Sequence, residues 1–204
     1  VYANYLRSSG VDLEIWLAAG TYPTRIYPEH GTAFFGGFMG TESTLDERPS
    51  TGYITILTPE SAAGSIVATY GPWTTAFDRI TFLGSGVAQY SGGAVSLQGP
   101  SQFEDCVFSG NKSGYSGGAL YAGWSDYYRL ITIDGCLFEN NEAVLTGGAV
   151  ALEDQGIQAV VSGNTFRHNR AGGRGGAVSV GYGYLDSHSA VLTANSFSDN
   201  AAAE

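Results

Sequence analysis

The chain has 204 residues, of which 43% are hydrophobic and 14% charged, a composition typical of a folded protein with a sizeable core. Nine basic residues against nineteen acidic ones give a formal charge of −10, which disfavours a nucleic-acid partner. No run approaches the roughly 18 consecutive apolar residues of a membrane helix, so we expect no transmembrane segment in this chain. The chain begins with Val1 and its last residues fall within a repeat unit, which favours a segment of a longer protein.

Residues 1–76 contain short apolar segments that lack the spacing of a helix. The segments run for a few residues with period two, which predicts strands at 14–19, 32–35, 53–57 and 65–68. We interpret residues 1–76 as the first, less regular rungs of the same fold as residues 77–204, because no charged or Pro/Ser-rich linker precedes Phe77. A separate small domain is the alternative.

Residues 77–204 contain a repeat of roughly 25–31 residues. Gly-Gly-Ala occurs at 92–94, 117–119, 147–149 and 175–177, each time before a short apolar strand. A phenylalanine recurs at Phe82, Phe108, Phe138, Phe166 and Phe197. Three residues later stand Asn111, Asn141, Asn169 and Asn200, with Ser85 in the first copy. Two residues before the phenylalanine stand Ile80, Cys106, Cys136, Asn164 and Asn195.

Repeats of this length, with several short strands and no helix, cannot bury a core alone and therefore stack as coils. We predict an all-β fold, a single-stranded right-handed parallel β-helix (solenoid) of about seven rungs. Each sequence position then lies over itself, so the phenylalanines form an inward column and the asparagines hydrogen-bond along another. In the strands that follow each Gly-Gly-Ala unit, we expect the valine and leucine side chains to point into the core. We expect a flat outer face of small residues: Ala94, Ser96, Ala149, Ala151, Ala177 and Ser179.

Cys106 and Cys136 occupy the same repeat position one rung apart. The expected Cα separation of about 5 Å permits a disulfide, but stacked side chains point the same way, which is poor geometry for the bond. The same column holds Asn164 and Asn195, which suits a small polar position. We favour free thiols, and a disulfide is the alternative.

The F-x-x-N…GGA unit resembles the repeat of polymorphic outer-membrane proteins and related bacterial surface β-helix proteins. The segment IWLAAGTYPT, with FFGGFMGTESTLDERPSTGYITIL after it, resembles a leading block found just upstream of such repeats in large secreted proteins. Together the two patterns cover the chain from about Glu14 onward. The resemblance implies bacterial-type secretion, an extracellular or cell-surface location, and a role in adhesion or as an extended scaffold. Neither pattern includes a catalytic signature.

Parallel β-helices include polysaccharide lyases and hydrolases, whose sites need clustered acidic residues. The outward positions beside the phenylalanine column hold no catalytic types: Val107, Leu137, Thr165 and Ser196. Three acidic residues are expected near one corner: Glu104, Asp105 and Asp134. We favour the interpretation that they are solvated turn residues, and a catalytic pair is the alternative. We therefore expect no enzyme.

The remaining charged residues also favour structural roles. His30, His168 and His188 lack ligand spacing, so we expect no metal or other cofactor. For the basic cluster of Arg167, Arg170 and Arg174, pairing with neighbouring acids is favoured over binding of a sulfated or carboxylated glycan. Glu42 and Arg48 are expected to pair and to pin the loop 40–49.

The features that do not repeat are the loops and the ends. Two lengthened loops hold candidate contacts for surface glycans or a protein partner: Trp124, Tyr127, Tyr128, Tyr182, Tyr184 and His188. The alternative is that these loops fold back and bury their rings. An uncapped last rung would continue into further sequence or accept another copy head-to-tail. The favoured hypothesis is a structural or adhesive surface module able to assemble into a fibre; the alternatives are a carbohydrate-binding module and a polysaccharide lyase or hydrolase.

Overall fold

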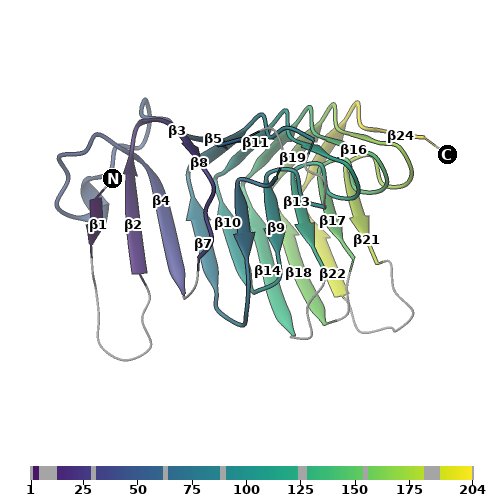
Figure 1. Ribbon diagram of the computed structural model, residues 1–204, viewed down its shortest axis with the longest axis horizontal. Helices are drawn as coiled ribbons and strands as arrows, with labels where there is room; N and C mark the ends of the chain where they lie inside the picture. The colour runs from purple at the N-terminus through teal and green to yellow at the C-terminus, as the bar shows by residue number, and fades with distance from the viewer. Residues whose placement is uncertain are drawn as a thin grey trace.

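The computed structural model describes residues 2–4, 13–28, 31–61, 64–87, 91–123, 128–153, 156–181 and 189–203. Successive coils of the chain stack along one axis, with the N-terminus at one end and the C-terminus at the other (Figure 1). Nearly every strand pairs in parallel with the strand at the same place in the coil before and the coil after it. The fold is a parallel β-solenoid, which confirms the predicted fold class.

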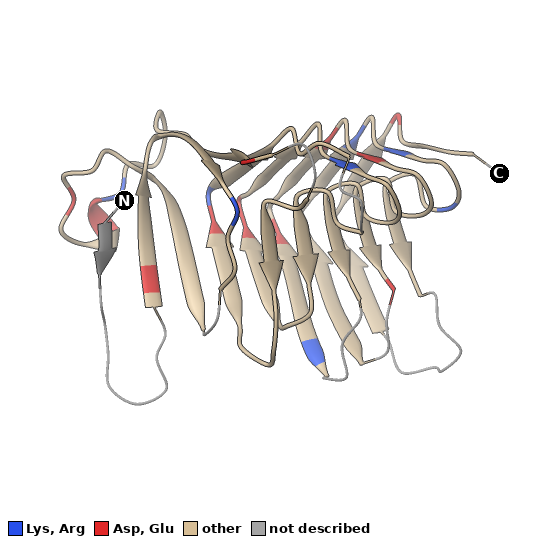
Figure 2. Ribbon diagram, in the orientation of Figure 1, with Lys and Arg blue, Asp and Glu red and all other residues tan. Residues whose placement is uncertain are grey.

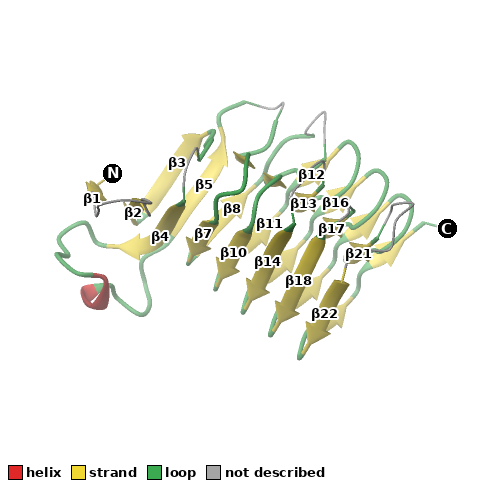
Figure 3. Cartoon of the chain, turned by 90° about the horizontal axis from the view of Figure 1, so that it is seen from below, coloured by secondary structure: helices red, strands yellow, loops and turns green. Residues whose placement is uncertain are grey.

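Sheet A, the longest sheet, has the strand order β1-β2-β4-β7-β10-β14-β18-β22. Its strands are β1 (Tyr2–Asn4), β2 (Leu13–Ala18), β4 (Thr32–Phe38), β7 (Thr75–Asp78), β10 (Ser101–Glu104), β14 (Arg129–Asp134), β18 (Ile157–Ser162) and β22 (Ser189–Thr193). All of them pair in parallel except β1, which is antiparallel to β2. Figure 3 shows β4 to β22 lying side by side along the solenoid.

Three further sheets complete the coils. Sheet B contains β3 (Gly20–Thr24), β5 (Thr55–Pro59), β8 (Ile80–Leu83), β11 (Val107–Ser109), β15 (Leu137–Glu139), β19 (Thr165–Arg167) and β23 (Ser196–Ser198). Sheet C contains β6 (Val67–Thr69), β9 (Val95–Leu97), β13 (Leu120–Ala122), β17 (Val150–Leu152) and β21 (Val178–Val180). Sheet D is made of two-residue strands: β12 (Lys112–Ser113), β16 (Glu142–Ala143), β20 (Arg170–Ala171) and β24 (Ala201–Ala202). One 3₁₀ turn, η1 (Leu45–Glu47), lies in the loop after β4.

The number of complete rungs is smaller than predicted. Sheets A and B each hold seven parallel strands, whereas sheet C holds five, so five described rungs have all three sides. The prediction of about seven rungs is therefore too high. Among the described residues, the first coil reaches sheet C through the isolated bridge between Ile26 and Val67.

Two columns of phenylalanine rings fill the interior. Along sheet B the rings stack with centroid separations of 4.6 to 4.9 Å: Phe82, Phe108, Phe138, Phe166 and Phe197. Along sheet A, Phe34, Phe77 and Phe103 stack at 5.1 and 5.3 Å, and the two columns meet edge to face. Each stacked pair adds about 0.5–1.5 kcal/mol beyond the burial of its area. The repeat therefore produces one continuous aromatic core.

The Gly-Gly-Ala corner brings neighbouring rungs into backbone contact. A Cβ at Gly148 would lie 2.1 Å from the carbonyl oxygen of Gly176, so no side chain fits there. Ala149 is fully buried in the core, and Ala151 on the outer face is also fully buried. The prediction that the corner alanines face outward is therefore wrong for Ala94, Ala149 and Ala177, which lie in the core. Ala151 faces outward as predicted, but it is covered.

The reason lies in the local backbone. The carbonyl of Ala119 accepts from the backbone N–H groups of both Ala94 and Val95, so alternation starts only after the corner alanine. The turn that precedes each corner also covers the outer face of sheet C, since a Cβ at Gly147 would lie 2.9 Å from the Ala151 Cβ.

A second corner uses left-handed backbone, and it allows a stabilising substitution. Gly163 and Ala194 occupy equivalent places one rung apart, with φ of +66° and +54°. We expect Ala194→Gly to raise the free energy of unfolding by about 0.5–1 kcal/mol, because glycine adopts this conformation without strain. Urea denaturation followed by circular dichroism measures the change. Gly163→Ala is the reverse change and serves as the control. The added Cβ would lie 3.5 Å from its nearest neighbour, so it causes no clash, and the substitution should not stabilise the protein.

Candidate functional site

The repeated asparagines form a buried hydrogen-bonded ladder. Asn141 Oδ1 accepts from the backbone nitrogen and the Nδ2 of Asn111, both at 3.0 Å. The backbone nitrogen and Nδ2 of Asn141 donate in turn to Asn169 Oδ1, at 3.0 and 2.9 Å. Nδ2 also donates to the carbonyl of Phe108 at 3.0 Å, and the pattern continues to Asn200. The ladder satisfies the buried polar groups of each turn and serves the fold.

The cysteine column is a second ladder. Cys106 and Cys136 are both buried free thiols, and the Cys106 backbone nitrogen donates to Cys136 Sγ at 3.4 Å. In the next rungs Asn164 Oδ1 accepts from the Cys136 backbone nitrogen at 2.8 Å, and Asn195 continues the chain of contacts. Burial raises the pKa of the Cys106 thiol well above 9.0, and its hydrogen bond with Cys136 raises this pKa further. A neutral, buried thiol is a poor nucleophile.

The raised pKa of Cys106 makes stability depend on pH. The folded thiol stays neutral above pH 9, where the unfolded thiol ionises. This contribution to stability is therefore complete below about pH 9 and is lost as the pH rises further, by up to about 1.4 kcal/mol per pH unit. Urea denaturation between pH 8 and pH 10.5 measures the free energy of unfolding. This free energy should fall more steeply with pH for the native chain than for Cys106→Ala. Equal slopes would contradict the assignment.

The surface charges pair largely between rungs. Arg167 Nη2 lies 2.6 Å from Glu139 Oε2, and Lys112 Nζ lies 3.0 Å from Glu142 Oε2. Arg174 is exposed and lines a groove of about 360 Å³ that also contains Glu153. The three arginines of the predicted basic cluster thus have different surroundings, since Arg170 lies beside Glu142 in register.

The predicted acidic corner is present in the fold. Glu104 lies between Asp78 and Asp134 in the register of sheet A, and Figure 2 shows acidic residues at the ends of these neighbouring strands. Asp105 follows with a positive φ of 49°. Among the residues that the structure describes, no group of three or more His, Cys, Asp and Glu is placed to hold a metal ion.

Most of the aromatic loop residues lie outside the described residues: Trp124, Tyr127, Tyr182, Tyr184 and His188. The same holds for His30. Tyr128 is described and is 64% exposed at the start of β14. Its neighbour Arg129 is fully buried and occupies the inner-face position of β14 two residues before Ile131, so the period-two spacing of this strand could have predicted its burial.

An exposed aromatic surface lies on the N-terminal rungs, where sequence reasoning did not place one. Tyr27 and Tyr70 stack with ring centroids 6.3 Å apart, and the guanidinium of Arg25 lies 5.1 Å from the Tyr27 centroid. Tyr27, Tyr70 and Trp73 are each about half exposed. We call Arg25, Tyr27 and Tyr70 the tyrosine surface. Its rings come from different coils, so their proximity depends on the stacking register.

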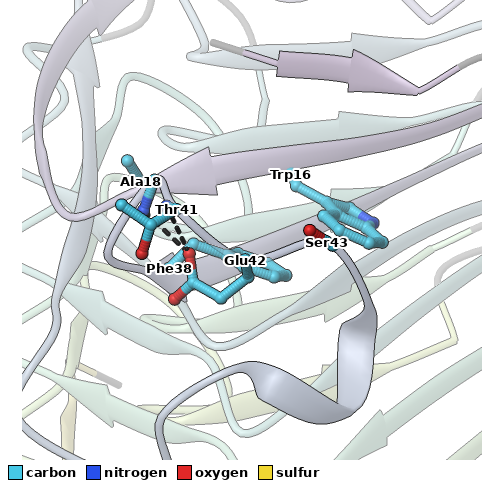
Figure 4. Close-up of a pocket in the computed structure, with 7 residues that line it drawn as sticks. Trp16, Ala18, Phe38, Thr41, Glu42 and Ser43 are labelled. Carbon is cyan, nitrogen blue, oxygen red and sulfur yellow. Dashed lines mark hydrogen bonds between the residues drawn. The ribbon is translucent and has the colours of Figure 1, made fainter.

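A pocket of about 440 Å³ lies between the first strands of sheet A and the loop after β4 (Figure 4). We call it the Trp16 pocket; its lining residues are Trp16, Ala18, Phe38, Gly40, Thr41, Glu42 and Ser43. The rings of Trp16 and Phe38 stack at 5.0 Å with an interplanar angle of 6°. Trp16 Nε1 donates to Glu14 Oε2 at 3.3 Å, which helps to fix the indole.

Glu42 holds the rim of this pocket through backbone contacts. Its carboxylate accepts from the backbone N–H groups of Met39, Gly40 and Thr41 at 2.7, 2.8 and 2.9 Å. Gly40 has a φ of +98°, and the turn directs successive N–H groups toward one point, an arrangement that binds anions. Desolvation alone would raise the pKa of Glu42, but these donors outweigh it and lower this pKa below 4.5.

The predicted pair between Glu42 and Arg48 is therefore wrong. Arg48 instead forms a bidentate pair with Asp78, at 3.0 and 3.1 Å. The backbone N–H groups of the turn satisfy the Glu42 carboxylate locally. Arg48 therefore does not pair with Glu42, and its side chain extends to Asp78 in β7.

The stacked rings, the two polar ladders and the glycine corners define this chain as a parallel β-helix repeat protein. A family model of the Chlamydia polymorphic membrane protein repeat matches residues 105–123. The matched segment contains Cys106, Phe108, Asn111 and the corner at 117–119, so the chain carries a repeat similar to the repeat of that family. Comparison with curated proteins and with solved structures gave no match. Within the described part of the chain, no helix has the length and apolar character needed to cross a membrane.

Proposed function

We propose that this chain is a structural module of a bacterial surface protein, secreted or held at the outer membrane, with a role in adhesion. The observation that carries the proposal is the match to the polymorphic membrane protein repeat on a continuous β-solenoid. The repeated Phe, Asn and Gly positions serve stacking, so the outer loops and the ends are free to contact partners. Polymorphic membrane proteins are so named because they are membrane-associated, which supports a location at the cell envelope.

The location can be tested on intact cells of the bacterium that encodes the chain. Antibodies raised against the folded chain should bind before lysis, and external protease should remove the signal. A chain detected only after lysis would contradict the proposal. A cytoplasmic marker monitored in parallel reports any leakage.

Self-association through the last rung is part of this proposal. Phe197 is 50% exposed and Leu192 is 41% exposed, whereas their partners one rung earlier, Phe166 and Val161, are fully buried. A further rung of a longer chain, or the end of another copy, would cover these side chains. At the opposite end β1 covers β2, and edge strand β3 contains Pro23, two features that disfavour strand addition. For association of this chain with itself we therefore propose contact between two last rungs in place of head-to-tail growth into a fibre.

Leu192→Lys should weaken this association at least tenfold, because a charged group would then enter the apolar contact. Light scattering over a concentration series measures the mass. Val160→Lys is the control, since Val160 is 38% exposed on the outer side of β18 and should leave association unchanged. A monomer at every concentration would refute self-association, and long fibres in electron micrographs would refute pairing of last rungs.

A second candidate function is carbohydrate binding without catalysis. It is favoured by the half-exposed rings of the tyrosine surface and by Tyr128, which is 64% exposed. A glycan array probed with the intact chain tests it, and a polysaccharide panel assayed for products tests the lyase or hydrolase alternative. Binding without product formation is expected.

A further inference from the structure

The groove that Arg174 lines begins where a column of turn side chains stops. Tyr115 and Leu145 occupy the same place in successive turns, since the Leu145 backbone nitrogen donates to the Tyr115 carbonyl at 2.8 Å, and both side chains are about half exposed. Gly173 holds this place in the next turn, and a Cβ there would lie 2.6 Å from the Leu145 carbonyl oxygen. No side chain can therefore extend from Gly173 beside Leu145, and a groove of about 360 Å³ lies there. We call it the Arg174 groove.

Part of the groove lining is a chain of hydroxyl groups that ends on a carboxylate. Ser116 and Thr146 each precede a Gly-Gly-Ala unit, and their hydroxyl oxygens lie 2.9 Å apart. Thr146 Oγ1 also donates to Glu153 Oε1. Because a threonine hydroxyl has one proton, Thr146 donates to Glu153 and accepts from Ser116. These groups offer oxygen acceptors in fixed places, so a ligand that contacts them needs hydroxyl donors.

The next member of the same column is Arg174, which replaces the hydroxyl residue before the last Gly-Gly-Ala unit. Its backbone is fixed, because the Gly147 nitrogen donates to its carbonyl at 3.0 Å. Among the described residues no acidic side chain forms a salt bridge with Arg174, whereas Arg167 pairs with Glu139 at 2.6 Å. The Arg174 guanidinium therefore keeps its donors for an anionic group that enters the groove.

The charges of the groove select the class of ligand. A charge-assisted hydrogen bond to a guanidinium is about twice as strong as a neutral one, so Arg174 favours an anionic group over a sugar hydroxyl. Glu153 would repel a second anionic group, and the formal charge of −10 disfavours a long polyanion. A single acidic sugar residue has one anionic group for Arg174, hydroxyl donors for Glu153 and an apolar face for Leu145.

We propose that the Arg174 groove binds one acidic sugar residue of a glycan, with its carboxylate or sulfate on Arg174 and its hydroxyl groups donating to Glu153 and Thr146. The volume of about 360 Å³ lies within the range of about 300–1,000 Å³ usual for small-ligand sites. This inference rests on the carbohydrate-binding function proposed above. It names the class of sugar and a site that is distinct from the tyrosine surface on the N-terminal rungs.

Isothermal titration calorimetry of the whole chain measures the Kd for each class of sugar. The ligands are the methyl glycosides of glucuronic and galacturonic acid, of sulfated glucose and galactose, and of unmodified glucose and galactose as neutral matches. At least one acidic glycoside should bind at least about tenfold more tightly than its neutral match, because one charge-assisted contact is added. The carboxylated and sulfated ligands show which anionic group the groove prefers.

Variants locate the bound sugar. Arg174→Gln should raise the Kd for the acidic sugar at least about tenfold and remove the preference over the neutral match. Leu145→Ala, which removes the apolar contact and leaves every charge in place, should raise the Kd severalfold. Arg167→Gln is the control, an equal charge change at an arginine that pairs with Glu139, and should leave the Kd unchanged. Circular dichroism checks that each variant is folded.

Three outcomes would overturn the proposal: no acidic sugar binds, neutral sugars bind as tightly as acidic ones, or Arg174→Gln weakens binding no more than Arg167→Gln. If the glycan array is positive and only Tyr70→Ala abolishes binding, the carbohydrate-binding function stands and the site is the tyrosine surface. A negative array removes both.

Discussion

Gly148→Ala should lower the free energy of unfolding by more than about 4 kcal/mol, or prevent folding altogether. The added Cβ would lie 2.1 Å from the Gly176 carbonyl oxygen and 2.6 Å from the Arg170 carbonyl carbon, and both neighbours are backbone atoms that cannot rotate away. The two rungs would have to separate, which would break interstrand bonds such as that from the Gly148 nitrogen to the Gly175 carbonyl at 3.0 Å. Urea denaturation followed by circular dichroism measures the loss.

Gly110→Ala is the matched control. Gly110 has a φ of +65°, and a Cβ there would meet no atom within 4 Å. Its cost is therefore conformational strain alone, about 1–2 kcal/mol. If Gly148→Ala cost no more than Gly110→Ala, close rung-to-rung contact would not be the reason for glycine at the second position of the corner.

Asn141→Leu is expected to cost about 3–6 kcal/mol, because it removes one step of the buried asparagine ladder. The side chain is 1% exposed, and its loss leaves the backbone N–H of Asn111 and the carbonyl of Phe108 without these partners. Each such buried group costs about 1–3 kcal/mol. Urea denaturation gives the total, and faster amide hydrogen exchange at Asn111 should show that the damage is local.

Asn140→Gly is the control for the ladder. Asn140 is adjacent and exposed and has a φ of +55°, and Gly110 occupies the equivalent place one rung earlier. The change should stay within about 0.5 kcal/mol. A similar loss for both variants would mean that the turn backbone, and not the ladder, sets stability here.

The fold was predictable because a solenoid converts sequence spacing directly into spatial position. Once Phe108 and Phe138 are matched in the repeat, parallel pairing places one over the other, and their rings lie 4.6 Å apart. The same reasoning applies to Asn111 and Asn141, whose side chains hydrogen-bond at 3.0 Å.

Features that break the repeat were not predictable in the same way. The pair of Arg48 with Asp78 joins a loop to a strand of another coil, and the partner that Arg48 reaches depends on how the loop folds. Ala149 was expected on the surface because strand alternation was extended through a corner where the backbone is not a regular strand. The Trp16 pocket combines β2, β4 and a loop, and no spacing rule connects them.

By itself, the sequence determined the solenoid, its register and the residues that stack inside it, because parallel stacking needs only the period and the residue type at each position. The tertiary structure alone decided the number of complete rungs, the pair of Arg48 with Asp78, and the exposed tyrosine surface near the N-terminus. These features depend on how loops of unequal length fold across neighbouring coils, and that path is set by side-chain packing and backbone hydrogen bonds between segments that share no repeat.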